Sequence, residues 1–180
     1  MSEGFERIGS RRVATLAFLD VERAYYRTPD GGSMVRDLVR HPGSVVVVPW
    51  SGEAVFLIRQ YRAAAGGSLL ELPAGKLDVP GETPEQTAIR ETVEEIGMRP
   101  GRLTRLHEVF LSPGFTDESS RIFLAEDLEP VDIDPQGAEE QHAEVVSMTL
   151  DAVRGAIDAG TIRDATTLIG LYALLQQHRP

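Results

Sequence analysis

The 180-residue sequence contains no cysteine, which excludes disulfide bonds and thiolate metal sites. It also has no apolar run long enough to cross a bilayer. The N-terminal stretch "MSEGFERIGSRR" lacks the apolar segment of a secretory signal. These absences fit a cytoplasmic protein, and that is the location we expect.

Positive charge is scarce as well. The chain has 18 lysines and arginines against 28 aspartates and glutamates, which gives a formal net charge of −10. This balance argues against nucleic acid as a main partner, because phosphate backbones require a basic surface. No segment indicates a membrane partner. An acidic protein that handles anionic phosphates needs a local cation, and a divalent metal is the simplest source.

Hydrophobic residues make up 42% of the chain, enough for one domain with a sizeable core. The first third reads as strands, and "TPDGGS" at residues 28–33 has hairpin-turn chemistry. Further strands are expected at residues 44–50, 54–62, 69–73, 103–111, 120–125 and 144–148. Helices are expected at residues 84–96, 151–159 and 165–177. Mixed strands with one helix in the middle and two at the end predict an α/β (α+β) sandwich.

The middle helix has clear boundary signals in "LPAGKLDVPGETPEQTAIRETVEEIGM". Thr83 is a good N-cap, Pro84 suits the first helical position, and Gln86 completes a capping box. Gly97 suits the position just after the helix. The sequence therefore predicts a helix with sharply defined ends.

Within this helix, Ile89, Val93 and Ile96 form an apolar stripe, and we expect the three acidic residues Glu91, Glu94 and Glu95 on the opposite side. One interpretation is an ordinary solvated charged face. Against it, the helix has no lysine, and the acids lie near the negative end of its dipole, where carboxylates are disfavoured. A divalent cation with oxygen ligands would turn their mutual repulsion into attraction.

The segment also resembles a known motif. The residues that match are Gly75, Glu82, Arg90, Glu91, Glu94, Glu95 and Gly97. They resemble the Nudix box, G-x5-E-x7-R-E-U-x-E-E-x-G-U, in which U is a bulky apolar residue. The spacing departs from this pattern at one place, since six residues rather than five separate Gly75 from Glu82, and Thr92 is a small occupant of the first U position.

The resemblance implies roles for these residues. Glu91 and Glu95 would be the principal metal ligands, with Glu94 close by as a third and the carbonyl of Ala74 as a further ligand. Arg90 would orient the helix acids. The implied cofactor is Mg²⁺, with Mn²⁺ as an alternative.

Three other segments resemble the ADP-ribose pyrophosphatase branch of the family: "RQYR", "ELPAGKLD" and "SPGFTDE". By this resemblance, the substrate contacts would be Arg62, Pro113, Gly114 and Glu118. The simpler interpretations are a plain turn for "SPGFTDE" and solubilising charges at a sheet edge for Arg59 and Arg62. Strand alternation predicts that Arg62 shares a face with Gln60 and that Arg59 points the other way.

The resemblance places the catalytic base on a glutamate in a mobile loop between late strands, which here is "DIDPQGAEEQHAEVV". We expect Glu140 first and Glu139 second, since Glu144 should already begin the following strand. The helix acid Glu94 is the next candidate. A solvated acidic loop is the alternative interpretation.

The resemblance as a whole implies a Nudix-type α/β/α sandwich of mixed sheets around the acidic helix. Residues 41–180 would form the hydrolase domain, and strands in residues 1–40 would form a dimerisation region, giving a homodimer. The implied reaction is Mg²⁺-dependent cleavage of ADP-ribose to AMP and ribose 5-phosphate. Alternatives are another nucleoside diphosphate derivative, such as GDP-mannose, or a non-catalytic module that binds ADP-ribose.

Overall fold

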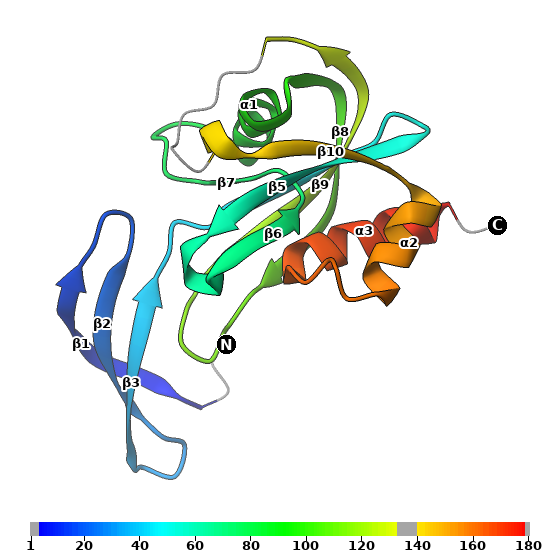
Figure 1. The fold of residues 1–180 in the computed structure, drawn as a ribbon. Helices are drawn as coiled ribbons and strands as arrows, with labels where there is room; N and C mark the ends of the chain where they lie inside the picture. The colour runs from blue at the N-terminus through cyan, green and yellow to red at the C-terminus, as the bar shows by residue number, and fades with distance from the viewer. Residues whose placement is uncertain (1–3, 133–139, 179–180) are drawn as a thin grey trace. The chain divides into compact units, whose positions relative to one another are not determined.

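The structure is a computed structural model that describes residues 4–132 and 140–178 (Figure 1). The chain divides into two compact units. One consists of Met1–Gly43 and Phe110–Ser119, and the other of Ser44–Val109 and Ser120–Pro180. Each unit is described separately.

The N-terminal unit is built on a three-stranded antiparallel sheet. Its strands are β1 (Glu6–Thr15), β2 (Asp20–Arg27) and β3 (Ser33–Arg40), in that order. The "TPDGGS" turn joins β2 to β3, with the Thr28 N–H donating to the Gly32 carbonyl at 3.0 Å, so the predicted hairpin is confirmed. The segment of residues 110–119 pairs with β3, since the Val39 N–H donates to the Phe115 carbonyl at 2.8 Å.

The larger unit contains two sheets. The first has the order β7-β4-β9-β8 and the second the order β10-β5-β6. The strands of the first are β4 (Ser44–Pro49), β7 (Ala74–Lys76), β8 (Met98–Phe110) and β9 (Ser119–Pro130). Those of the second are β5 (Ala54–Arg62), β6 (Gly67–Glu71) and β10 (Glu144–Thr149). Short 3₁₀ turns lie at η1 (Ala63–Ala65) and η2 (Glu140–His142).

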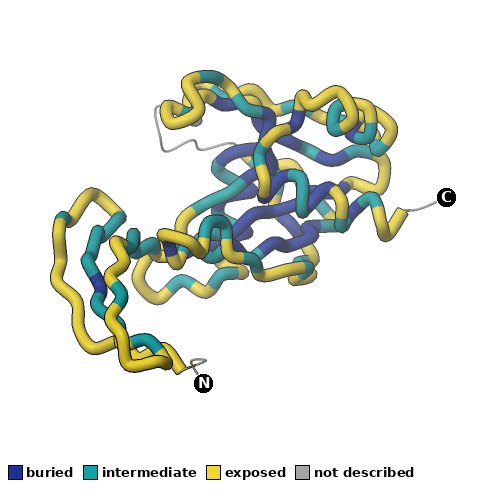
Figure 2. Tube along the Cα trace, turned by 90° about the horizontal axis from the view of Figure 1, so that it is seen from below, coloured by how far each residue is buried: buried dark blue, intermediate teal, exposed yellow. Residues whose placement is uncertain are grey.

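Helices cover both faces of β4. Because side chains alternate along a strand, Val46 and Val48 join one apolar cluster and Val45 and Val47 join another. The first cluster includes Leu171 from helix α3 (Ala165–Gln177) and residues of α2 (Leu150–Asp158), whereas the second includes Ala88 from α1 (Pro84–Ile96). The larger unit is therefore the predicted α/β/α sandwich of mixed sheets, and Figure 2 shows buried residues gathered in its interior.

The described residues contain no helix that is both long and apolar enough to cross a membrane.

Candidate metal and active site

Helix α1 begins and ends where the sequence predicts. Thr83 and Gln86 form the capping box, and Gly97 adopts the left-handed conformation that ends the helix. Its buried face differs from the prediction, however. Glu91 and Glu95 are each only 7% exposed, and the predicted apolar stripe is largely wrong because Ile89 and Val93 are only half-buried.

The close approach of strand β7 explains this inverted face. A Cβ built on Gly75 would lie 1.9 Å from the carboxyl carbon of Glu91, so the two are in contact and no larger residue fits. The rest of the buried face consists of Thr87, Ala88, Thr92 and Ile96, of which only Ile96 is large. Helical periodicity assigns apolar residues to the buried face. That prediction is wrong here because the backbone of β7 approaches α1 closely at Glu91.

Glu95 reaches the same strand. Its Oε2 accepts a hydrogen bond from the Ala74 N–H at 2.9 Å. Ala74 pairs with Val46, and the neighbouring Val47 N–H donates to the Pro73 carbonyl at 2.9 Å. Bonded and non-bonded pairs alternate in an antiparallel ladder, so the N–H and C=O of Ala74 both point away from β4. The Ala74 carbonyl therefore faces the same side as its N–H, which is the side of the Glu95 carboxylate.

Arg90 forms hydrogen bonds with three acidic residues of the motif. Its Nη1 donates to Glu91 at 2.7 Å and to Glu94 at 2.9 Å, and its Nε donates to Glu82 at 3.0 Å. Partial burial alone would lower the pKa of Arg90, but hydrogen bonds to Glu82 and the charges of Glu91 and Glu94 outweigh it and raise the pKa. The extra residue between Gly75 and Glu82 therefore does not prevent Glu82 from reaching Arg90.

The same hydrogen bonds act on Glu82. The Arg90 guanidinium, together with the Thr87 hydroxyl at 2.9 Å, holds the pKa of Glu82 below its ordinary value. Glu82 is thus an ionised anchor for the guanidinium. Arg90 in turn fixes Glu91 and Glu94 on the helix.

The donor set can be compared with what a divalent ion requires. Among residues 4–132 and 140–178, no group of three or more acidic or histidine side chains forms a ready-made metal cage. Mg²⁺, however, is usually held by one or two carboxylates, with waters and substrate phosphates completing its shell. Glu91 and Glu95, buried one helical turn apart beside the Ala74 carbonyl, fit that requirement.

A third buried carboxylate, Glu71, lies at the end of β6. Glu71 accepts a hydrogen bond from the Gln60 amide at 3.1 Å and pairs with Arg62 at 2.7 Å. Gln60 and Arg62 thus share a face of β5, as predicted, while the exposed Arg59 pairs with Glu144 at 3.4 Å. Sequence reasoning missed Glu71 as the shared partner of Gln60 and Arg62; the common face predicted for Gln60 and Arg62 was the available signal.

The "SPGFTDE" segment belongs to the N-terminal unit. It forms a turn over Pro113 and Gly114, in which the Phe115 and Thr116 N–H groups donate to the Ser112 carbonyl, each at 3.1 Å. Within the same unit, Glu118 lies 3.8 Å from His41. The acidic helix belongs to the other unit.

The predicted base lies at the edge of what the structure describes. Glu139 falls outside the described residues, and of Glu140 only the backbone is described, as the first residue of η2. Glu144 begins β10, as expected.

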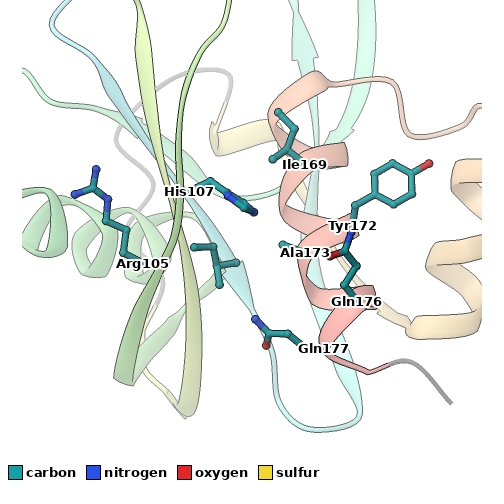
Figure 3. A pocket seen from close by; sticks show the side chains of 8 residues that line it. Arg105, His107, Ile169, Tyr172, Ala173, Gln176 and Gln177 are labelled. Atoms are coloured by element: carbon teal, nitrogen blue, oxygen red, sulfur yellow. The ribbon is translucent and has the colours of Figure 1, made fainter.

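Described residues of the larger unit line two hollows that bear on the site. One, of about 350 Å³, is on the outer face of α1 and is lined by Gln86, Ile89, Arg90, Val93, Glu94 and Arg99. The other, of about 660 Å³, lies between β8 and α3 (Figure 3). Arg105 and His107 line it from β8, with Tyr172, Gln176 and Gln177 from α3. Neither lining includes Glu91 or Glu95.

Known proteins resemble this chain in fold and in sequence. A solved structure described as an ADP compounds hydrolase superposes with a TM-score of 0.85 at 22% identity, covering 97% of this chain and 94% of its own, which shows the fold. The ADP-ribose pyrophosphatase of Bacillus subtilis (strain 168) is 35% identical over 170 residues, covering 94% of this chain and 89% of the relative.

The ADP-ribose pyrophosphatase of Mycobacterium tuberculosis (strain ATCC 25618 / H37Rv) is 40% identical over 177 residues, covering 94% of this chain and 83% of the relative. The family model described as the NUDIX domain matches residues 40–168. This match spans the whole acidic motif and most of the larger unit, and the chain therefore belongs to the Nudix family.

Proposed function

We propose that the protein is a Mg²⁺-dependent pyrophosphohydrolase that converts ADP-ribose and water to AMP and ribose 5-phosphate. The observation that carries this proposal is the pair of buried carboxylates, Glu91 and Glu95, directed at the backbone of β7. The pyrophosphatases that are 35% and 40% identical over most of the chain support the choice of ADP-ribose.

In this proposal, Glu91, Glu95 and the Ala74 carbonyl hold the metal, with Glu94 beside them. Bound Mg²⁺ would neutralise charge on the diphosphate and lower the pKa of the attacking water. Burying neighbouring carboxylates is unfavourable without a counter-charge. Arg90 supplies one to Glu91 and Glu94, and a bound cation would add a second at this site.

Arg62 is the proposed diphosphate contact in the larger unit. Its planar guanidinium suits phosphate oxygens, and Glu71 together with Gln60 fixes its position on β5. Pro113, Gly114 and Glu118 are proposed as further substrate contacts from the N-terminal unit.

The proposed general base is Glu140, with Glu139 as the second choice. A base has to come within about 3 Å of the attacking water, directly or through one other water. Glu140→Gln is expected to lower kcat strongly with little effect on KM, because the residue acts mainly in the transition state. Glu144, the first residue of β10, is paired with Arg59 of β5, so Glu144→Gln serves as the matched control.

We also propose that the protein is a homodimer. Eight of the twelve large hydrophobic side chains that are exposed among the described residues belong to the N-terminal unit: Phe5, Ile8, Val13, Leu16, Phe18, Val35, Phe110 and Phe115. Exposed apolar surface of this kind marks an interaction site, and a second copy is the proposed occupant.

The function is tested by comparing rates on ADP-ribose, GDP-mannose and a nucleoside triphosphate at equal concentration with Mg²⁺, with the products identified by chromatography. We expect ADP-ribose to be cleaved fastest, to AMP and ribose 5-phosphate. Faster cleavage of GDP-mannose would contradict the substrate assignment, and binding of ADP-ribose without hydrolysis would contradict catalysis.

A further inference from the structure

The segment that joins β6 to β7 carries the carbonyl of Ala74, and contacts with other elements hold it in place. The Leu72 N–H donates to the Thr167 hydroxyl of α3 at 2.9 Å, in a buried position. One residue later, the Pro73 carbonyl accepts from the Val47 N–H of β4 at 2.9 Å. Of these two hydrogen bonds, the one from Leu72 is accepted by a side chain of α3.

Thr167 is itself held firmly. It is fully buried, and its N–H donates to Oδ2 of Asp164, the N-cap of α3, at 2.7 Å. Asp164 also accepts a hydrogen bond from the Thr166 hydroxyl at 2.6 Å. Thr166 and Thr167 thus share Asp164 as a partner, but it is the Thr167 hydroxyl that accepts the hydrogen bond from the Leu72 N–H.

Close packing keeps α3 against the segment. A Cβ built on Gly170 would lie 2.7 Å from Leu72 Cδ1 and 2.9 Å from Val48 Cγ2, so the helix contacts both at this point. The exposed side of α3 carries Tyr172 and Gln176, which line the hollow of Figure 3. The buried side of α3 therefore serves to fix the β6–β7 segment.

We propose that Thr167 is a positioning residue of the metal site, which it serves by fixing the Leu72 backbone two residues before the Ala74 carbonyl. The inference rests on the proposed metal binding. Without the hydroxyl acceptor, the buried Leu72 N–H has to shift or find water, because unpaired buried donors are unfavourable. The shift passes along the chain to Ala74, whose N–H binds Glu95. Both a metal-ligating carbonyl and a metal-ligating carboxylate are then displaced.

The test compares four proteins: the wild type, Thr167→Val, Thr167→Ser and Thr166→Val. Thr167→Val keeps the shape and removes the hydroxyl, and Thr167→Ser keeps the hydroxyl. Thr166→Val removes a hydroxyl that donates to Asp164, the N-cap of α3. Mn²⁺ binding is measured by electron paramagnetic resonance in the absence of substrate. Amide hydrogen exchange at Leu72 is measured on the metal-free protein.

We expect Thr167→Val to bind Mn²⁺ about 10-fold more weakly than the wild type, in the range found for residues that orient metal ligands. The Leu72 amide should also exchange faster in this variant. Thr167→Ser and Thr166→Val should bind like the wild type. If Thr167→Val is too unstable to purify, Thr167→Ala against Thr167→Ser makes the same comparison, since the two differ by one oxygen.

The outcomes separate this inference from the proposed function. Wild-type protein that binds no Mn²⁺ would contradict the metal site itself. Wild-type binding together with equal binding by Thr167→Val would leave the metal site standing and overturn the role of Thr167. Equal weakening by Thr166→Val would also overturn it, because the effect would then come from the helix cap.

Discussion

In the larger unit, carboxylates are buried beside backbone and the strands pack in an apolar core, whereas in the N-terminal unit ion pairs and large apolar side chains are both exposed. Glu91 and Glu95 exemplify the first arrangement. Ile8 and Val13, both on the edge strand β1 and each 52% exposed, exemplify the second. The larger unit has a core of its own, while the three-stranded sheet exposes large apolar side chains, as interaction surfaces do. The proposed metal site therefore falls in one unit and the proposed dimer contact in the other.

The largest expected effect lies in the core of the larger unit. Leu171 is fully buried in the main apolar cluster, so Leu171→Ala should lower the free energy of unfolding by about 2–5 kcal/mol. Ile8→Ala, on the exposed strand, should change it by no more than about 0.5 kcal/mol. Denaturant unfolding followed by fluorescence of Trp50, the only tryptophan and a member of the same cluster, measures both. Equal decreases in the free energy of unfolding for the two variants would contradict the contrast between the units.

The second effect concerns the contact between β7 and α1. Gly75→Ala forces Glu91 away, since the new Cβ would lie 1.9 Å from its carboxyl carbon. We expect turnover of ADP-ribose to fall about 100-fold, as for other displacements of about 1 Å in an active site. Gly155→Ala is the control, because a Cβ there meets no atom within 4 Å. Near-normal activity of Gly75→Ala would show that the position of Glu91 is unimportant.

Some features of this site could be predicted from the sequence and others could not, for physical reasons. The ends of α1 follow from local chemistry at Thr83 and Gly97, and the opposite faces of Arg59 and Arg62 on β5 follow from strand alternation, so both were predicted correctly. The short strand β7 was missed because three residues show no period. The buried position of Glu91 was missed too, since it depends on the backbone of a strand sixteen residues earlier in the chain rather than on any local pattern.

The third effect concerns association of the N-terminal unit. Ile8→Asp combined with Val13→Asp places charge on the exposed edge of β1 and should convert the proposed dimer to monomer. Light scattering measures the mass. Val79→Asp, at an exposed apolar residue of the larger unit, is the control and should leave the mass unchanged. A wild type that is already monomeric would contradict the proposed dimer.

The smallest effect is a pH dependence within the N-terminal unit. Partial burial disfavours the ionised form of Glu22, but hydrogen bonds and charge from Arg40 outweigh it, so the pKa of Glu22 lies below its ordinary value of 4.5. Asp117 behaves likewise, with Arg40 again as the partner that lowers its pKa below 3.8. The unfolded chain takes up protons at the ordinary values, so this stability is present above them and is lost as pH falls through the lower folded-state pKa values.

Amide exchange along β2 should therefore accelerate as the pH falls below about 4.5, relative to the exchange rate of the unfolded chain at each pH. The acceleration should be smaller in Arg40→Met, which has already lost the pairing. Arg59→Met removes an exposed pair of the other unit and is the control. Identical pH profiles for Arg40→Met and the wild type would rule out this ion-pair contribution.

The central claim is that the buried carboxylates of α1 hold a divalent metal, and Mn²⁺ titration followed by electron paramagnetic resonance tests it most directly. Three proteins are compared without substrate: the wild type, Glu95→Gln and Glu85→Gln. Glu85 lies on the same helix but is exposed, so both changes remove one negative charge from α1. The account predicts that the wild type and Glu85→Gln bind Mn²⁺ equally and that Glu95→Gln loses most of this binding. Undiminished binding by Glu95→Gln would contradict it.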